Sequence, residues 1–358
     1  MIETRNTAEL PISDKLRRLR EPSAYASPPP CVDVIETHMS YVFLAGERVY
    51  KLKKPVRFAF LDFSTVAARE ADCREELRLN RRLAPRVYLD VVPLTLAPGG
   101  LTVNGDGDVV DWLVEMRRLP AELMLDRLIA EGRLGGARID ALAETLASFY
   151  ARVDRTAMTP SEYVARFFRE HAETRRVLLA SEPEGSRSRR RNLSREPSAA
   201  LDPTHVAALL DRLESLLVAA TPTLEARVRT GHVVDGHGDL RPEHICFCEP
   251  IAIFDCLEFN RELRQVDAFD ELAFLDVECA LLGAPDFGAR LIAATAARLG
   301  DQPSPALVSL YGACRAALRA RLAMAHLRDP HPREADKWEP LAARYLRLAE
   351  ERMAQARA

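Results

Sequence analysis

The sequence predicts an α+β protein in which a small antiparallel β-rich region precedes a larger, mainly helical one. Two observations predict this class. Between residues 31 and 116, short runs rich in β-branched and aromatic residues alternate with turn residues. Beyond residue 117, apolar residues recur at steps of three and four, as in amphipathic helices. Strands first and helices afterwards favour this arrangement over a doubly wound parallel sheet.

Composition limits the classes of protein that need to be considered. The chain has 358 residues, enough for two modest domains, and 47% of them are hydrophobic. Its 50 basic and 53 acidic side chains give a net charge of −3, so nothing in the charge favours nucleic acid or a membrane as a partner. Because the sequence has no membrane-length apolar run, no secretory signal and only scattered cysteines, we expect a soluble cytoplasmic protein.

The β-rich region follows an N-terminal extension, residues 1–30, in which a short helix is predicted near residues 13–20. The small lobe itself is predicted to span residues 31–116. Within it we expect strands at residues 32–36, 40–45 and 49–53, a helix at 65–83, and strands at 91–96 and 109–116. This gives a small antiparallel sheet that carries one helix.

The helical lobe is predicted over residues 117–358. Apolar stripes mark helices at residues 139–153, 206–217 and 267–282, and others follow towards the C-terminus. Asp202 and Pro203 form a plausible cap and first-turn pair for the second of these helices. The arginine-rich segment 181–198 has no interleaved aromatic residues, so a mobile surface loop is expected there in preference to a nucleic-acid patch.

The segment 234–258 carries the most informative pattern. Glycines flank the His237-Gly238-Asp239 run, which predicts a tight loop. A hairpin is then predicted around Glu249-Pro250, and its second strand ends at Asp255. Two carboxylates near one hairpin suit phosphoryl transfer, since one orients the acceptor hydroxyl and the other holds magnesium. The alternative is that Asp239 caps a loop and Asp255 ends a strand.

This segment resembles the catalytic segment of the aminoglycoside phosphotransferase-like kinases, H-G-D-L-H-x-x-N followed by a hairpin and a metal-binding Asp. Residues 36–65 and the downstream LRLNRRLAP resemble in particular the phosphotransferase-like domain that bacterial proteins fuse to a P-loop kinase domain. No G-x-x-x-x-G-K-[ST] motif is present, so we expect the stand-alone domain. The resemblance implies a protein-kinase-like two-lobe fold, ATP and Mg²⁺ as cofactors, and a small hydroxylated substrate.

The resemblance also implies roles for individual residues. Asp239 is the expected base, with His237 and Arg241 beside it. Lys51 and Lys53 alternate along one strand and so face the same side; one of them is expected to contact the ATP phosphates. The remaining nucleotide contacts are expected from a helix glutamate (Glu76, with Glu75 as the alternative), from Ser40 in the turn 37–40, and from the adenine-binding segment that includes Glu115, Met116 and Arg117.

Two positions depart from the family pattern: Arg241 replaces the second His, and His244 replaces the metal-binding Asn. Magnesium prefers oxygen ligands, which leaves three explanations open. Asp255 holds the metal with water and phosphate oxygens, with His244 beside it; Glu243 or Glu258 supplies a further oxygen; or the protein is a nucleotide-binding pseudokinase that serves as a regulatory module. Arg241 either grips an anion or forms a structural tie to one of these glutamates.

Two further groups of residues have both a chemical and a structural interpretation. His244, Cys246 and Cys248 alternate on one strand, which makes a zinc site conceivable, although buried unreactive cysteines are favoured over it. Asp267 and Glu271 open a helix. The resemblance implies that an acidic residue in this region ties the catalytic loop to the helical lobe, and capping of the helix is the local alternative.

Overall fold

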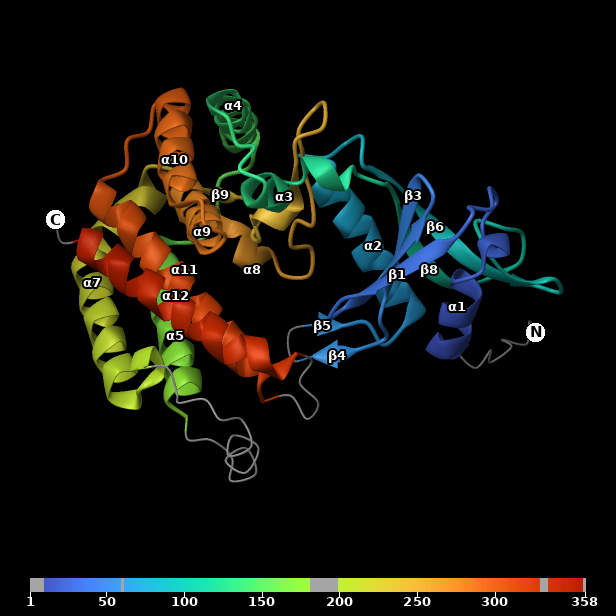
Figure 1. The fold of residues 1–358 in the computed structure, drawn as a ribbon, viewed down its shortest axis with the longest axis horizontal. Helices are drawn as coiled ribbons and strands as arrows, with labels where there is room; N and C mark the ends of the chain where they lie inside the picture. The colour runs from blue at the N-terminus through green and yellow to red at the C-terminus, as the bar shows by residue number, and fades with distance from the viewer. Residues whose placement is uncertain (1–9, 59–60, 181–198, 329–333, 357–358) are drawn as a thin grey trace. The chain divides into compact units, whose positions relative to one another are not determined.

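A computed structural model describes residues 10–58, 61–180, 199–328 and 334–356 (Figure 1). The predicted loop at 181–198 lies outside these ranges. The chain divides into two compact units, and each is described by itself. The first contains Met1–Leu125 and Glu243–Leu263, and the second contains Asp126–Pro242 and Arg264–Ala358. The first is built on an antiparallel sheet and the second mainly on helices, so the predicted α+β class is confirmed.

A six-stranded antiparallel sheet forms the first unit, in the order β1-β2-β3-β8-β6-β7. Its strands are β1 (Val32–Glu36), β2 (Ser40–Ala45), β3 (Arg48–Lys53), β6 (Tyr88–Ala97), β7 (Gly100–Val103) and β8 (Asp108–Arg117). A separate two-stranded piece pairs β4 (Arg57–Phe58) with β5 (Leu61–Asp62). The predicted strands are present, and β7 is an addition: it is only four residues long and begins at a glycine.

The two faces of the sheet bury different cores, because side chains alternate along each strand. Phe43 and Leu52 pack on one face with the short helix α1 (Ile12–Leu19). Val49 and Val114 pack on the other face with helix α2 (Val66–Asn80), which lies against β6 and β8 (Figure 1). The alternation puts Lys51 and Lys53 on the same face as Val49, which is the face that α2 covers.

Helix α2 begins where its cap predicts. The Thr65 hydroxyl accepts the backbone N–H of Ala68 at 3.1 Å, which satisfies one of the free donors of the first turn. The helix ends at Asn80, five residues before Pro85. Cys73, Glu76 and Leu79 are buried on the side that faces the sheet.

Residues 243–263 belong to the first unit, although residues 126–242 of the second unit separate them from its other part in the sequence. They form the predicted hairpin, β10 (Ile245–Cys246) and β11 (Ala252–Ile253), with a cis peptide bond at Glu249-Pro250. The sequence predicts this hairpin within the helical lobe, residues 117–358. The structure groups it with the sheet because Cys246 and Ala252 pack into the core beside α2.

Helices make up most of the second unit, together with the short pair β9 (Val233–Asp235) and β12 (Gln265–Asp267). The helices are α4 (Gly136–Arg152), α5 (Pro160–Leu179), α7 (Pro203–Arg229), α9 (Ala268–Leu281), α10 (Pro285–Leu299), α11 (Pro305–His326) and α12 (Ala335–Gln355). Two short helices cross the boundary between the units: α3 (Leu125–Ala130) has its first residue in the first unit, and α8 (Arg261–Arg264) has its last residue in the second. The predicted cap holds: the Asp202 carboxylate accepts from the N–H groups of Thr204 and His205, each at 3.0 Å. Within the described ranges, no helix combines the length and the apolar character that spanning a membrane requires.

Helix α9 is the centre of the second unit. Every residue from Ala268 to Cys279 is buried, and α10, α11 and α12 all contact this helix (Figure 1). The carboxylate of Asp267 caps it by accepting the N–H of Phe269 at 2.9 Å. A helix surrounded in this way is a fixed support for the loops that begin and end beside it.

Candidate active site

Lys51 on β3 pairs with two carboxylates of the first unit, those of Glu76 and Asp255. Its Nζ lies 2.8 Å from Glu76 Oε1 and 2.8 Å from Asp255 Oδ1. Glu76 is fully buried on α2, whereas 42% of the Asp255 side chain is exposed. The sequence left Glu75 and Glu76 as alternatives. The structure pairs Glu76 with the lysines and Glu75 with Arg78 on the surface.

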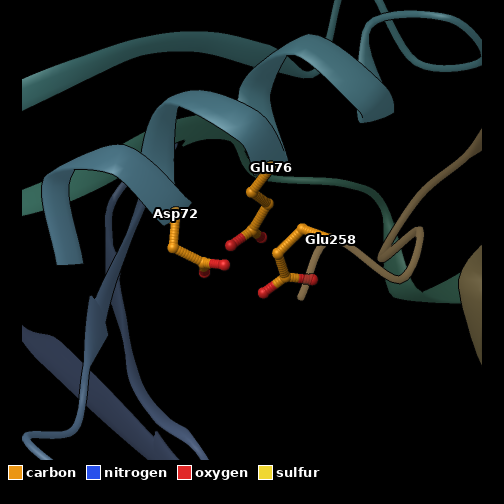
Figure 2. Close-up of side chains that lie close together, drawn as sticks. All are labelled: Asp72, Glu76 and Glu258. Carbon is orange, nitrogen blue, oxygen red and sulfur yellow. The ribbon is translucent and has the colours of Figure 1, made fainter. Parts of the chain in front are cut away.

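Lys53 has a different environment, although it stands on the same face of β3. Its Nζ lies 2.6 Å from Asp72 and 2.5 Å from Glu76, and it also pairs with Glu258. Only 1% of the Lys53 side chain is exposed, against 12% for Lys51. Figure 2 shows the carboxylates of Asp72, Glu76 and Glu258 turned towards one another.

These three carboxylates form the only group of metal-binding type among the described residues, with their ligand atoms within 4.8 Å of one another. Lys53 is the cation that pairs with all three of them. An ammonium group is therefore already the partner of each carboxylate that would attract a metal ion to this point. The contacts of Lys53 are those of a buried ion-pair cluster.

Charge is not balanced over the whole cluster, because two ammonium groups face the four carboxylates of Asp72, Glu76, Asp255 and Glu258. Burial and the nearby Glu76 raise the pKa of Glu258 to about 7, even though Lys53 opposes the shift. Burial also disfavours the charged lysines, but the carboxylates outweigh it and raise the pKa values of Lys51 and Lys53 well above the ordinary one. Both lysines are thus cations at neutral pH.

Asp255 follows β11 in a left-handed backbone conformation, with φ of 60°. Its N–H donates to the Tyr88 hydroxyl at 3.2 Å, and its Oδ2 lies 3.5 Å from His244 Nε2. Removal from water raises the pKa of Asp255, but Lys51 and His244 more than offset this and hold the pKa well below its usual range. The side chain is therefore an exposed, permanently ionised carboxylate.

The donor set fits magnesium through Asp255. Mg²⁺ bound to nucleotides uses one or two carboxylates, with phosphate oxygens and waters as its other ligands. Glu258 is less suited, since it is almost buried and paired with Lys53. His244 offers a nitrogen and lies beside Asp255. Of the predicted metal ligands Asp255, His244 and Glu258, the contacts favour Asp255.

The other predicted nucleotide contacts of the first unit lie in the sheet. Ser40 begins β2, is 1% exposed, and its N–H donates to the Thr37 hydroxyl at 3.0 Å, which closes the turn 37–40. Glu115, Met116 and Arg117 end β8, whose neighbours are β3 and β6. The Arg117 N–H donates to Val87 O at 2.8 Å. The adenine contact that the resemblance implies for this segment stays a prediction.

The loop that carries Asp239 lies in the second unit and is held by a buried carboxylate. Glu271 on α9 accepts the N–H groups of His237 (2.9 Å) and Gly238, together with the Tyr150 hydroxyl at 2.7 Å. Gly238 has φ of 87°, a conformation that favours glycine. Both interpretations of the acidic residues at 267–271 hold, because Asp267 caps α9 and Glu271 ties the loop to it.

Arg241 lies two residues after Asp239, and its Nη2 is 4.0 Å from Glu278 Oε2 on α9. The same glutamate accepts from Arg319 Nε and from the Tyr345 hydroxyl, each at 2.8 Å. Arg319 and Glu278 were not predicted from the sequence, because they lie on separate helices far from the loop in the chain.

The cysteines do not form a zinc site in the described part of the chain. All seven are free thiols. Burial raises the pKa of Cys246 to about 12, and Cys248 donates to Pro250 O at 3.2 Å. Cys246 is thus the buried, unreactive cysteine that the sequence favours, whereas Cys248 is only partly buried.

Comparisons with known proteins agree with this architecture, although no family model matches the sequence. Uncharacterised proteins of Mycobacterium tuberculosis and Mycobacterium bovis are each 32% identical over 334 residues, which cover 91% of this chain and 61% of the relative. The chain thus spans about three fifths of the length of the curated relatives that it matches.

Two solved structures show the fold. A choline kinase from Cryptosporidium parvum matches with a TM-score of 0.52 and 11% identity, over 96% of both chains. A spectinomycin phosphotransferase in complex with ADP and spectinomycin matches with a TM-score of 0.50 and 12% identity, over 95% of this chain and 97% of that one. The chain has the kinase-like α+β fold found in aminoglycoside phosphotransferase and choline kinase structures.

Proposed function

We propose that the chain is an ATP- and Mg²⁺-dependent phosphotransferase that moves the γ-phosphoryl group of ATP to a hydroxyl of a small molecule. The observation that carries the proposal is the Lys51–Glu76–Asp255 arrangement, in which a strand lysine is paired with a buried helix glutamate and with an exposed carboxylate. A lysine held in this way is the group that kinases direct at nucleotide phosphates. A protein of the same fold has been solved with ADP, which supports a nucleotide ligand.

We assign the phosphate contact to Lys51 and not to Lys53. Lys51 is partly exposed and its partner Asp255 is open to solvent, so an incoming phosphate can replace part of this ion pair. Lys53 is enclosed by three carboxylates and is 1% exposed. Its role is to hold Glu76 and Glu258 in place.

Asp239 is the proposed base. It accepts the proton of the acceptor hydroxyl while the oxygen forms a bond to the γ-phosphorus, and the bond to the β–γ bridging oxygen breaks to release ADP. Glu271 fixes the backbone on which Asp239 stands through its bonds to His237 and Gly238. Magnesium, bound through Asp255, would neutralise charge on the phosphates. Lys51 supplies a second positive charge there.

One observation favours a second candidate, a nucleotide-binding pseudokinase. His244 stands where the resembling family has a metal-binding Asn, and it lies 3.5 Å from Asp255. A nitrogen ligand is poorly suited to Mg²⁺. A chain of this kind would bind ATP in the absence of magnesium and would not turn it over.

The test is ATP binding with and without Mg²⁺, followed by ATP turnover, in the wild type and in Asp239→Asn. The phosphotransferase proposal expects magnesium to strengthen binding, and it expects Asp239→Asn to abolish turnover while ATP affinity stays close to that of the wild type. Tight binding independent of magnesium, with no turnover in the wild type, favours the pseudokinase. Turnover that persists in Asp239→Asn removes this residue from the mechanism.

A further inference from the structure

Arg319 on α11 is a mostly buried arginine that forms hydrogen bonds through its Nε. Its Nε donates to Glu278 Oε1 at 2.8 Å and to the Tyr345 hydroxyl at 3.2 Å. Among the described residues, these are the hydrogen bonds that Arg319 makes, so its Nη1 and Nη2 have no protein acceptor there. The side chain is 18% exposed.

The guanidinium group is held rigidly. Its Cζ lies 5.5 Å from the centre of the Tyr345 ring and 5.9 Å from that of Phe274. Glu278 is itself 6% exposed and accepts the Tyr345 hydroxyl at 2.8 Å. These groups come from α9, α11 and α12, three helices that pack on one another (Figure 1). A planar fork fixed in this way loses little freedom when it binds an oxyanion.

The charge of the Arg319 guanidinium group interacts with that of Asp239. Burial disfavours the charged form of Arg319, but Glu278, Tyr345 and Asp239 outweigh it and raise its pKa above the ordinary value. Arg241, on the Asp239 loop, lies 4.0 Å from the other oxygen of Glu278. Two guanidinium groups and the two carboxylates of Glu278 and Asp239 therefore lie in one region, and Glu278 is contacted by both arginines.

Neighbouring Arg315 is the contrast within the same helix. Its Nε and Nη2 each bind one oxygen of Asp270 at 2.7 Å, so this arginine is matched by a carboxylate of its own. Arg319 has no such bidentate partner in the described part of the chain, since Glu278 is contacted through Nε alone and lies close to Arg241 as well.

We propose that Arg319, with Arg241 beside it, binds a carboxylate or phosphate group of the acceptor, so that the substrate is an anionic hydroxyl compound and not a cationic one. The inference rests on the proposed phosphotransferase function, because it names the class of the acceptor. Forked Arg–carboxylate and Arg–phosphate pairs supply both affinity and orientation. The charged group of a cationic acceptor would offer no oxygen to accept from the Nη1 and Nη2 N–H groups of Arg319. The other source of an oxyanion is the phosphoryl group of ATP, and the experiment separates the two.

The experiment titrates protein saturated with a non-hydrolysable ATP analogue and Mg²⁺, so that all three nucleotide phosphates are already in place, and measures binding by calorimetry. The probes are glycerol 3-phosphate and glycerate (anionic), glycerol (neutral) and choline (cationic). The variants are Arg319→Met and Arg319→Lys, and the matched control is Arg347→Met, an exposed arginine on α12. Circular dichroism checks the fold, and Arg319→Lys keeps the charge if Arg319→Met does not fold.

We expect at least one anionic probe to bind more tightly than glycerol and choline. Arg319→Met is expected to weaken that binding about 10-fold or more, Arg319→Lys less, and Arg347→Met not at all. Choline binding as tightly as the anions, no binding of either anion, or unchanged affinity in Arg319→Met overturns the inference. If Arg319→Met weakens binding of the ATP analogue but not of the anions, the arginine serves the nucleotide, which also overturns the inference. The proposed function is tested separately by whether ADP and ATP bind at all.

Discussion

Replacing each strand lysine by methionine separates the two roles that the structure gives them. Lys51→Met removes one ammonium from Glu76 and Asp255, but Glu76 keeps its 2.5 Å pair with Lys53 and Asp255 remains exposed to water. We expect a cost of about 1–2 kcal/mol in the free energy of unfolding. Turnover is expected to fall about 10²–10³-fold, as when one preorganised donor is lost from a charged transition state.

Lys53→Met is expected to lower the free energy of unfolding more than Lys51→Met does. It leaves Asp72 and Glu258 with no ammonium partner, while Glu76 keeps Lys51, and breaking a buried pair of this kind costs about 3–5 kcal/mol. Lys53 lowers the pKa of Glu258, which is about 7 in the wild type, so removing this lysine raises the pKa further and the variant keeps a proton on Glu258 that the wild type releases above pH 7. The loss of stability is therefore expected to be larger at pH 8.

Urea denaturation measures both free energies, and ATP turnover is measured on folded protein. Lys54→Met is the matched control, since Lys54 follows Lys53 and pairs with Glu36 at the surface; it is expected to change stability by less than about 0.5 kcal/mol. The reasoning is wrong if Lys53→Met keeps the stability of the wild type and loses turnover, or if Lys51→Met keeps full turnover.

Three further changes test other parts of the site. Glu271→Gln is expected to lower the free energy of unfolding by about 1–3 kcal/mol and to reduce turnover, because the glutamine oxygen can accept the loop N–H groups but its NH₂ cannot accept the Tyr150 hydroxyl, which Oε2 accepts at 2.7 Å; wild-type stability in urea would contradict this. Glu258→Gln is expected to flatten the pH dependence of the free energy of unfolding. The folded wild type holds a proton on Glu258 up to about pH 7, whereas the unfolded chain releases it near pH 4.5, so the stability of the wild type falls as the pH rises between these values. An unchanged slope in Glu258→Gln would refute the raised pKa of Glu258. His244→Asn supplies an oxygen donor beside Asp255 and is expected to lower the Mg²⁺ concentration needed for half-maximal turnover; no change would show that His244 does not limit metal binding.

Much of the first unit could be predicted from sequence because its strands are short, β-branched and separated by turns. The alternation along residues 48–53 puts both lysines on one face, where the structure has them. Which lysine meets which carboxylate could not be predicted, since that depends on α2 and on the return of residues 243–263 to the sheet. The alternation of side chains along a strand is a local property of the sequence, whereas the position of residues 243–263 beside the sheet depends on tertiary packing.

In the second unit, too, features with local sequence signals could be predicted and features that depend on tertiary packing could not. The cap at Asp202 and the buried helix after Asp267 have local signals and were predicted. Helix α5 was missed although Thr159 and Glu162 form a capping box at its start, a signal that was present in the sequence. Arg319 carries no local signal, because Glu278 and Tyr345 reach it only through the packing of three helices.

The most direct test of the central claim is calorimetric titration of ATP into the wild type, Lys51→Met and Lys54→Met, each with and without Mg²⁺. The account predicts that Mg²⁺ strengthens ATP binding to the wild type, that Lys51→Met loses at least about 10-fold in affinity, and that Lys54→Met matches the wild type. ATP that fails to bind the wild type, or that binds Lys51→Met as tightly as the wild type, would contradict the assignment of Lys51, Glu76 and Asp255 to the nucleotide phosphates.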